Sequence, residues 1–306
     1  MQIQTQDLQN LPERLPLFIN PHAGSASALL EQLRKQKRLI IHQITPDKLR
    51  VALQTEIAAG TPRVLVCGGD GTLALAASIL LGSATAMAVV AGGTLNHFAH
   101  NWQLPIELNA ALDLAFTSPQ VTEVDVGSVN QDVFLNTSSV GAYVHFVRAR
   151  ELYERRMSYR LASICAGFKI LLRLRSGRMY VDGNKNHSPL IFIGVRERDM
   201  SFSGLGAVHA TSQNVLHVLI VKTTTYWSLT QLIFNVMFRG LEPATKLENV
   251  ASQLVEQVVI NNSQHKRSIY VALDGELTLQ TTPLKYRYVP NALLVVTPST
   301  GSSARE

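Results

Sequence analysis

The feature that most constrains the fold is a repeated order of apolar run, turn and helical segment in the first part of the chain. Strand-like apolar runs occur at Leu15–Ile19, Arg38–Ile44, Arg63–Cys67 and Met87–Ala91. Helical spacing separates them at Ala26–Arg38, Asp47–Ala59 and about Thr72–Leu81. Strands that alternate with helices of this length are typical of βαβ units. The sequence therefore predicts an α/β amino-terminal domain with a mostly parallel sheet.

One uncharged stretch, Leu73–Gly93, is long enough in principle to span a bilayer. Gly82-Ser83 interrupts it, alanine dominates it, and glycine turns flank it on both sides. This pattern favours a buried helix, a turn and a buried strand, because glycine marks turns between short elements. We therefore interpret the stretch as part of the core and not as a membrane span.

The pattern changes after about Val124, where strand-like runs follow one another with few helices between them. These runs are Val126–Val129, Val133–Asn136, Leu190–Val195, Val215–Val221, Ser268–Leu273 and Leu293–Thr297. The helical exceptions are a basic stretch, Arg148–Arg178, and Ser228–Arg239. The sequence predicts an α/β domain at 1–124 and a β-rich, sandwich-like carboxyl domain at 125–290, with a return of 291–306 to the first domain kept open.

Three glycine-containing turns follow three of the predicted parallel strands. They are Asn20-Pro21-His22-Ala23-Gly24-Ser25, Gly68-Gly69-Asp70-Gly71-Thr72 and Gly92-Gly93-Thr94-Leu95-Asn96. Ligands of open α/β sheets bind at the carboxyl edge of the strands, and glycines let a phosphate approach the main chain there. The three turns together predict a phosphate-binding edge.

Asp70 stands inside the second of these turns, where a carboxylate would repel a phosphate. A metal ion or a bound hydroxyl would remove that conflict, so Asp70 is a candidate for positioning magnesium, directly or through water. The alternative is an ordinary strand-to-helix turn in which the aspartate caps the helix.

With these motifs the sequence resembles the diacylglycerol-kinase-like catalytic family, which includes bacterial lipid kinases and, more distantly, NAD kinases. Asn20-Pro21-x-x-Gly24 resembles its first motif and Gly68–Thr72 its glycine-rich nucleotide signature. The resemblance continues in order to about Pro298, through Gly93–Ala99, Val124–Gly127, Phe134–Gly141 and Ala272-Leu273-Asp274-Gly275-Glu276.

The resemblance implies an ATP-dependent lipid kinase that phosphorylates a diacylglycerol-like or sphingoid hydroxyl, with Mg2+ as a further cofactor. It implies Glu276 as the base that takes the hydroxyl proton, with Asp274 in an orienting or metal-linked role beside it. Taken alone, Asp274-Gly275 equally indicates a hairpin turn. The residues implied to bind ATP are Asn20, Gly24, Thr45, Gly68, Gly69, Asp70, Gly71, Thr72, Thr94 and Asn96.

Three departures from the family pattern keep two other functions open. Ser25-Ala26-Ser27 carries no lysine, Leu73-Ala74 stands where the family has a polar pair, and the segment around Asn214 offers no carboxylate for a structural magnesium. A kinase of a soluble substrate, or a nucleotide- or lipid-binding protein without catalysis, would also fit these residues.

The basic excess lies in one segment. Arg148–Arg178 holds eight arginines and Lys169 against two glutamates, a charge of +7 in a chain of net charge +6. A local excess with interleaved apolar residues favours contact with an anionic membrane surface, although a solvated basic helix has the same pattern. We expect no nucleic-acid partner and keep a homodimer open. Two cysteines and a polar amino terminus without a signal pattern favour a cytoplasmic protein, peripheral at the inner membrane face.

Overall fold

The computed structural model describes residues 12–20, 26–93, 96–141, 144, 148–149, 152–153, 177–196, 214–221, 250–262 and 267–298. The chain divides into two compact units, of which the first comprises 1–126 with 290–306 and the second comprises 127–289. Gly24, Thr94, the predicted helix Ser228–Arg239 and most of Arg148–Arg178 lie outside the described residues.

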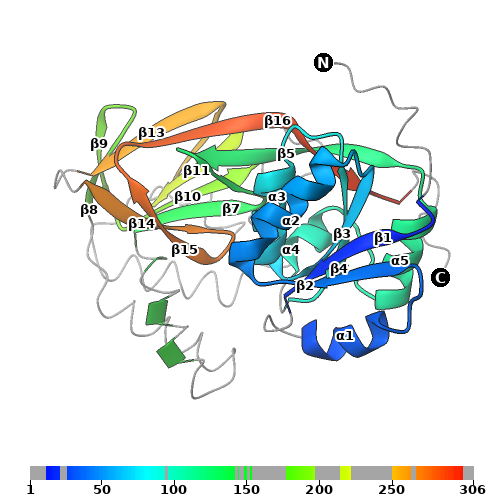
Figure 1. The fold of residues 1–306 in the computed structure, drawn as a ribbon. Coiled ribbons are helices and arrows are strands. Elements are labelled where there is room, and N and C mark those ends of the chain that lie inside the picture. The colour runs from blue at the N-terminus through cyan, green and yellow to red at the C-terminus, as the bar shows by residue number, and fades with distance from the viewer. Residues whose placement is uncertain are drawn as a thin grey trace, which may run out of the picture. The chain divides into compact units, whose positions relative to one another are not determined.

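The first unit is built on a parallel sheet with the strand order β2-β1-β3-β4-β16 (Figure 1). Every one of these neighbouring pairs is parallel, so the predicted α/β class with a mostly parallel sheet is confirmed. The strands are β1 (Leu15–Ile19), β2 (Leu39–Gln43), β3 (Arg63–Gly68), β4 (Ala86–Ala91) and β16 (Leu284–Val296), whose end returns to pair with β4.

Helices cover both faces of this sheet. The helices are α1 (Ala26–Leu33), α2 (Pro46–Ala58), α3 (Asp70–Leu80), α4 (His97–Asn101) and α5 (Leu108–Thr117). Alternate strand residues such as Leu17 and Leu65 pack with α1 and α5 in one core cluster, and α2 and α3 lie on the opposite face (Figure 1). Within α3 the buried residues are Leu73, Ala76, Ala77 and Leu80, which is the spacing of one helical face. α3 contains the first part of the uncharged stretch Leu73–Gly93, which was predicted to belong to the core.

Arg63 is a charged residue at the start of a strand that is otherwise apolar and buried. Its guanidinium donates to the carbonyl oxygens of Ala115 (2.6 Å) and Ser118 (2.8 Å) at the end of α5. Burial lowers the pKa of this guanidinium. The two carbonyls are groups that the end of a helix leaves without helical partners, so Arg63 fastens α5 to the sheet.

The second unit is β-rich, as the sequence predicted. One sheet has the order β12-β11-β10-β7-β14-β15 with antiparallel pairing between all described neighbours. Its strands are β7 (Thr137–Gly141), β10 (Leu190–Val195), β11 (Leu216–Val221), β12 (Val250–Val255), β14 (Ser268–Leu273) and β15 (Glu276–Thr281). The first half of β16 pairs with β13 (Gln257–Asn262), and β13 pairs with β8 (Gly177–Val181), followed by β9 (Asn184–Ser188). Residues of both sheets, among them Ile191, Val218 and Tyr286, form one core cluster.

Two strands connect the units along the chain. β5 (Val121–Val129) begins in the first unit and continues toward β6 (Asp132–Phe134), and β16 leads back. The predicted strand Leu293–Thr297 covers only the apolar end of β16. The preceding residues alternate between buried and exposed positions from Leu284 onward, with charged side chains on the exposed side, so they lack the apolar run that the prediction relied on.

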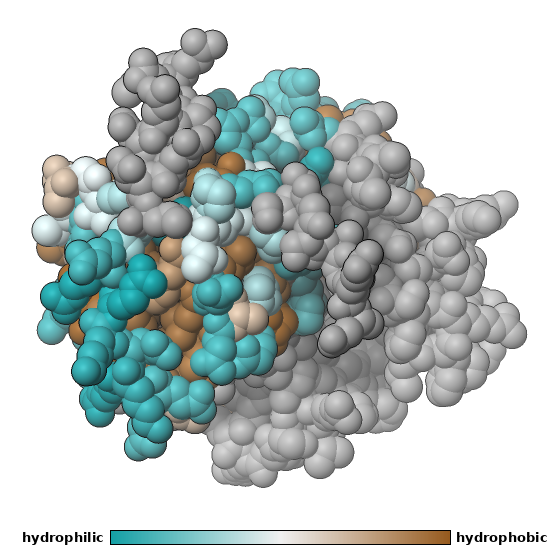
Figure 2. All heavy atoms as spheres, turned by 90° about the vertical axis from the view of Figure 1, so that its right-hand side faces the viewer, coloured by the Kyte–Doolittle hydropathy of each residue, from teal (hydrophilic) through white to brown (hydrophobic). Residues whose placement is uncertain are grey.

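The surface of the described residues carries few large apolar side chains. Figure 2 shows one face of the molecule, on which hydrophobic residues gather among hydrophilic ones. In the first unit the exposed ones are Ile40, Val51 and Ile106. Exposed apolar side chains in such small numbers are normal on a protein surface and need no partner to explain them. No helix in the described part of the chain is long and apolar enough to cross a membrane.

Candidate functional site

The carboxyl ends of four parallel strands bring the predicted phosphate-binding turns of the first unit to one edge. Ile19 of β1 pairs with Gln43 of β2 and with Cys67 of β3, and Gly68 pairs with Ala91 of β4. The residues that come directly after these strand ends are Asn20, Ile44-Thr45, Gly69 and Gly92. Parallel register therefore places turns that are far apart in the sequence next to one another.

Two glycine turns at this edge touch through their main chains. A Cβ atom added to Gly93 would lie 2.6 Å from Cα of Gly69, and one added to Gly69 would lie 3.2 Å from Cα of Gly93. The N–H of Gly92 donates to the carbonyl of Gly68 at 2.9 Å. A residue without a side chain is needed at Gly93, because a Cβ there would overlap the main chain of Gly69, and a Cβ at Gly69 would be tightly packed.

Helix α3 begins directly after Gly69 and has no side-chain cap. The N–H groups of its first turn have no partner within the helix and point out of its amino end, where the helix dipole favours a negative charge. Main-chain donors beside packed glycines are the arrangement that holds phosphates in many α/β proteins. The residues at this edge therefore fit the phosphates of a nucleotide.

Asp70, the first residue of α3, uses both carboxylate oxygens to hold the start of α4. Oδ2 accepts from the N–H of His97 at 3.1 Å and Oδ1 from the N–H of Phe98 at 2.9 Å. The alternative prediction was that the Asp70 carboxylate caps the helix in which it stands. It does cap a helix, but that helix is α4, whose first residue lies 27 positions further along the chain.

Asn96 closes the turn that precedes α4. Its Oδ1 accepts from the N–H of Gly93 and its Nδ2 donates to the carbonyl of Gly93, both at 2.9 Å. Its backbone is left-handed (φ 50°), which asparagine tolerates better than most residues, and its side chain is buried. Asn96 therefore shapes the turn from within.

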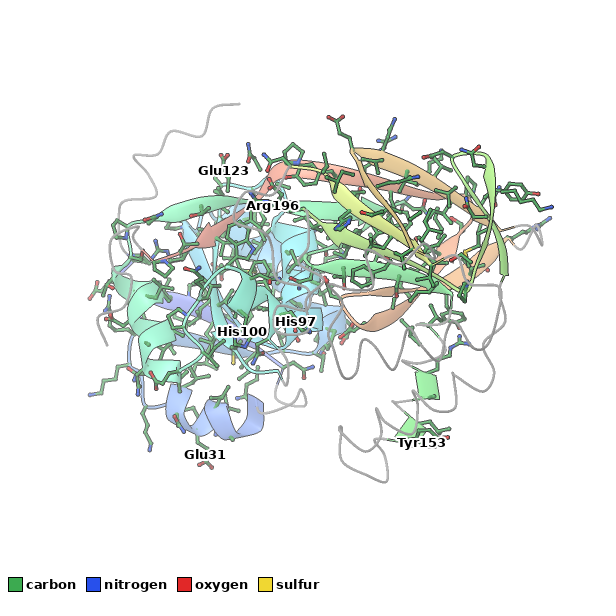
Figure 3. The ribbon with its side chains drawn as sticks, turned by 180° about the vertical axis from the view of Figure 1, so that it is seen from behind. Glu31, His97, His100, Glu123, Tyr153 and Arg196 are labelled. Atoms are coloured by element: carbon green, nitrogen blue, oxygen red, sulfur yellow. The ribbon has the colours of Figure 1, made fainter. Side chains whose placement is uncertain are left out.

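Other polar residues near this edge have separate partners. The hydroxyl of Thr45, which precedes α2, bonds to Asp47 and lowers the pKa of that exposed carboxyl. His97 and His100 are exposed on α4 (Figure 3). Cys67 is buried at the end of β3, and burial raises the pKa of its thiol to about 12, so it is a poor nucleophile.

In the second unit, Asp274 anchors the segment between β6 and β7. Oδ2 accepts from the N–H of Leu135 at 2.7 Å, and Oδ1 accepts from the N–H groups of Asn136 at 2.7 Å and Thr137 at 2.9 Å. The N–H of Asp274 donates to the carbonyl of Thr137 at 2.8 Å. These bonds join two motifs noted in the sequence, Phe134–Gly141 and Ala272–Glu276, and they engage both carboxylate oxygens of Asp274.

Asp274-Gly275 is also the two-residue turn between β14 and β15. Both residues have positive φ, 47° and 88°, as a type I′ hairpin requires. Glu276 is the first residue of β15, lies opposite Leu273 and is exposed. Asp274-Gly275 is therefore a hairpin turn, and the same turn presents the exposed carboxylate of Glu276 next to Asp274.

Two further carboxylates that anchor the main chain of the first unit had no role in the sequence analysis. Asp125, buried on β5, accepts from the N–H of Asn291 on β16 at 3.0 Å. Glu107 caps α5 by accepting from Asn109 (3.0 Å) and Ala110 (2.7 Å), and these bonds lower its pKa. The position of Glu107 just before an apolar helical segment was the sequence signal that could have predicted this cap.

Within the described residues, no three His, Cys, Asp or Glu side chains gather as a metal site. Mg2+ in phosphoryl-transfer sites needs only one or two carboxylates, because phosphates and water supply the other ligands. Asp70 is the carboxylate at the glycine turns, but a magnesium ion would have to share its oxygens with two main-chain donors.

Packed glycine turns at the carboxyl edge of a parallel sheet are typical of α/β proteins that bind phosphates. Residues 14–129, which contain these turns, match the family model of the diacylglycerol kinase catalytic domain. Over this segment, which is less than half of the chain, the protein is similar to that family.

Curated relatives are similar to parts or most of the chain. A probable lipid kinase, YegS-like, of Pseudomonas syringae pv. syringae is 36% identical over 87 residues, which is 28% of either chain. A diacylglycerol kinase of Mycobacterium tuberculosis is 25% identical over 268 residues, which is 82% of either chain.

Solved structures share the fold. A crystal structure of a diacylglycerol kinase from Bacillus anthracis aligns with a TM-score of 0.63 and 18% identity, covering 94% of this chain and 97% of the other. A second structure from that organism aligns with a TM-score of 0.68 and 19% identity, covering 94% and 98%. Both matches extend beyond residues 14–129 and therefore include the β-rich part of the fold.

Proposed function

We propose that this protein is an ATP-dependent lipid kinase, which transfers the γ-phosphoryl group of ATP to the hydroxyl of a diacylglycerol-like or sphingoid lipid. The observation that carries the proposal is the contact between the Gly68–Thr72 turn and the turn at Gly92-Gly93, inside the segment that matches the family model. Phosphoryl transfer requires mainly alignment and charge stabilisation, and main-chain donors beside glycines supply both for phosphates.

In this proposal ATP is bound by the residues at the strand ends of the first unit. The N–H groups at the start of α3 and the glycine turns hold the phosphates, while Asn20 and Thr45 line the neighbouring strand ends. Asn96 keeps the second turn in shape through its two bonds to Gly93. For Gly24 and Thr94, which lie outside the described residues, nucleotide contacts are implied by the family resemblance alone.

Glu276 is the proposed general base. It is exposed, so it can reach the hydroxyl of a substrate, and it directly follows the two-residue turn, so its main chain is fixed. Asp274, with its three main-chain bonds, orients this turn. A base of this kind contributes roughly 10²–10⁴-fold to the rate.

Magnesium, which the family implies, would enter with the phosphates of ATP and offset their charge when bound. Asp70 is the carboxylate at these turns, but both of its oxygens already accept main-chain N–H groups of α4.

A surface of the second unit supports contact with a lipid bilayer. Tyr270 and Leu279 lie directly opposite each other on β14 and β15, and both are largely exposed, at 42% and 55%. The Arg148 guanidinium lies over the Tyr270 ring, 3.8 Å from its centroid. An aromatic ring, an apolar side chain and a cation together suit an anionic membrane surface. They support a peripheral position at the inner membrane face as part of this proposal.

The first test is transfer of labelled phosphate from γ-labelled ATP into vesicles of mixed lipids, with and without magnesium. We expect labelled lipid only with magnesium, and its mobility identifies the acceptor. Labelling of a soluble acceptor alone would replace the proposal with a kinase of a soluble substrate. Binding of ATP without any transfer would replace it with a binding protein.

Glu276→Gln tests the base in the same assay. We expect turnover to fall by roughly 10²–10⁴-fold with the unfolding midpoint unchanged, because the exposed side chain contributes little to packing. Glu256→Gln is the matched control, since Glu256 is also an exposed glutamate of the second unit and should retain full activity. Equal activity of the two variants would remove Glu276 from the mechanism.

A further inference from the structure

The carboxylate of Asp70 connects two helices that begin at the two glycine turns. Asp70 is the first residue of α3, directly after Gly69, and its oxygens accept the first two N–H groups of α4, which follows the turn at Gly92-Gly93. One side chain therefore determines how the start of one helix lies against the start of the other. Each bond has a charged acceptor, which makes it stronger than a bond between neutral groups.

The turn at Gly92-Gly93 has further hydrogen bonds besides those that Asp70 makes to α4. Asn96 bonds to both polar main-chain groups of Gly93, and Gly92 bonds to Gly68. A Cβ on Gly93 would lie 2.6 Å from Cα of Gly69, so the two turns are packed directly against each other. Asn96 thus sets the shape of the second turn. Its position depends on the Gly92–Gly68 bond and on the two bonds of Asp70, whose carboxylate is the only charged partner of the turn among the described residues.

We propose that Asp70 is a positioning residue for the nucleotide site, which holds the turn at Gly92-Gly93 against the turn at Gly68–Thr72 and is not a ligand of magnesium. This inference rests on the proposed function and changes the role that the sequence predicted for Asp70. Both oxygens face main-chain donors, and a cation at the same oxygens would compete with those bonds. The role also explains why an acidic residue stands in a turn built for phosphates: two N–H donors of α4 offset its charge.

The chain contains a matched control. Glu107 also accepts two main-chain N–H bonds at the start of a helix of the first unit, at 3.0 and 2.7 Å, and none of them involves a glycine turn. Asp70→Asn and Glu107→Gln each replace a carboxylate by an amide, which accepts through one oxygen and turns an NH2 group toward a main-chain donor. Both variants lose the same kind of helix cap, but only one of them involves the nucleotide site.

The experiment measures ATP binding by calorimetry for the wild type, Asp70→Asn and Glu107→Gln, each in excess magnesium and in EDTA. If Asp70 positions the turn, Asp70→Asn weakens ATP binding by about tenfold or more under both conditions, the order expected for loss of one charge-assisted hydrogen bond. Glu107→Gln then binds ATP as the wild type does. If Asp70 is instead a magnesium ligand, Asp70→Asn binds ATP as the wild type does in EDTA, and only the increase in ATP affinity caused by magnesium is lost. That result would overturn the proposal.

Amide hydrogen exchange provides a second measurement that needs no nucleotide. The N–H groups of His97 and Phe98 should lose protection in Asp70→Asn and keep it in Glu107→Gln. Unchanged protection would overturn the proposal. If the wild type itself binds no ATP, the proposed function fails, and the exchange data alone show whether Asp70 holds α4.

Asn96→Gly covers the case in which Asp70→Asn does not fold. Glycine keeps the left-handed backbone at this position and removes both bonds to Gly93, while Asp70 stays intact. We expect the same loss of ATP affinity with and without magnesium. Normal binding by this variant would show that the fastening of the turn does not matter, and the proposal would then be wrong.

Discussion

Two Asp-Gly turns of the second unit have the same backbone but very different surroundings. Asp182-Gly183 joins β8 to β9 with φ of 48° and 79°, and Asp274-Gly275 joins β14 to β15 with φ of 47° and 88°. In each, the aspartate N–H donates to a carbonyl of a neighbouring segment, at 2.9 Å to Val259 and 2.8 Å to Thr137. The Asp182 carboxylate then accepts one N–H, from Val259, whereas that of Asp274 accepts three.

The difference shows that the dipeptide specifies the turn, while the surroundings specify what the carboxylate does. Asp182 is exposed and its partner Val259 is partly exposed, so water can replace their bond. Leu135 and Asn136, which donate to Asp274, are buried, so their N–H groups have no such replacement. A hairpin turn at Asp274-Gly275 and a functional role of the Asp274 carboxylate are therefore compatible with each other.

The largest effect should come from Asp274→Asn. Asparagine tolerates the left-handed backbone, so the turn survives, but one amide oxygen cannot replace two carboxylate oxygens with three donors. We expect a loss of about 2 kcal/mol in the free energy of unfolding, since buried donors are left unpaired. Urea unfolding followed by circular dichroism measures it, and amide exchange should accelerate at Leu135, Asn136 and Thr137. Unchanged exchange at these three positions would contradict the assigned role.

An intermediate and equal effect is expected at the two glycines. Gly183→Ala and Gly275→Ala should each cost about 1 kcal/mol, because a side chain is strained at positive φ. A Cβ at either glycine meets no atom within 4 Å, so no clash adds to this strain. The same unfolding experiment compares them. A much larger loss at Gly275 would mean that the turns differ in more than their aspartates.

The smallest effect should come from Asp182→Asn. Its single accepted bond is exposed, and an amide oxygen can accept it equally well, so the loss should stay below about 1 kcal/mol. Activity in the labelled-phosphate assay should be unchanged, whereas Asp274→Asn should lower it. A loss of activity in Asp182→Asn would remove the contrast between the two turns.

The regular elements of the first unit could be predicted because their cores are apolar runs. The predicted strand Leu15–Ile19 is β1 without change, and Ser268–Leu273 in the second unit is β14. The helix predicted at Ala26–Arg38 is shorter, since α1 ends at Leu33, where the polar residues 34–37 offer no further apolar face. α4 and α5 were not predicted.

Polar strands were beyond this kind of prediction. β9 reads Asn-Lys-Asn-His-Ser, and only its pairing with β8 makes it a strand. The candidate site was predicted as a set of residue types at one sheet edge. The hydrogen-bond partners of these residues could not be predicted from the sequence. Asp70 bonds to α4 and Asp274 bonds to residues 135–137, and only the tertiary fold brings these segments together.

The contact between Gly69 and Gly93 has an evolutionary consequence. In most packed pairs, a larger side chain on one partner can be accommodated by a smaller one on the other. Here neither residue has a side chain to give up, and a Cβ on Gly93 would already lie 2.6 Å from Cα of Gly69. A substitution at Gly93 thus has no compensating change at position 69, so Gly93 must be retained for as long as the two turns remain in contact.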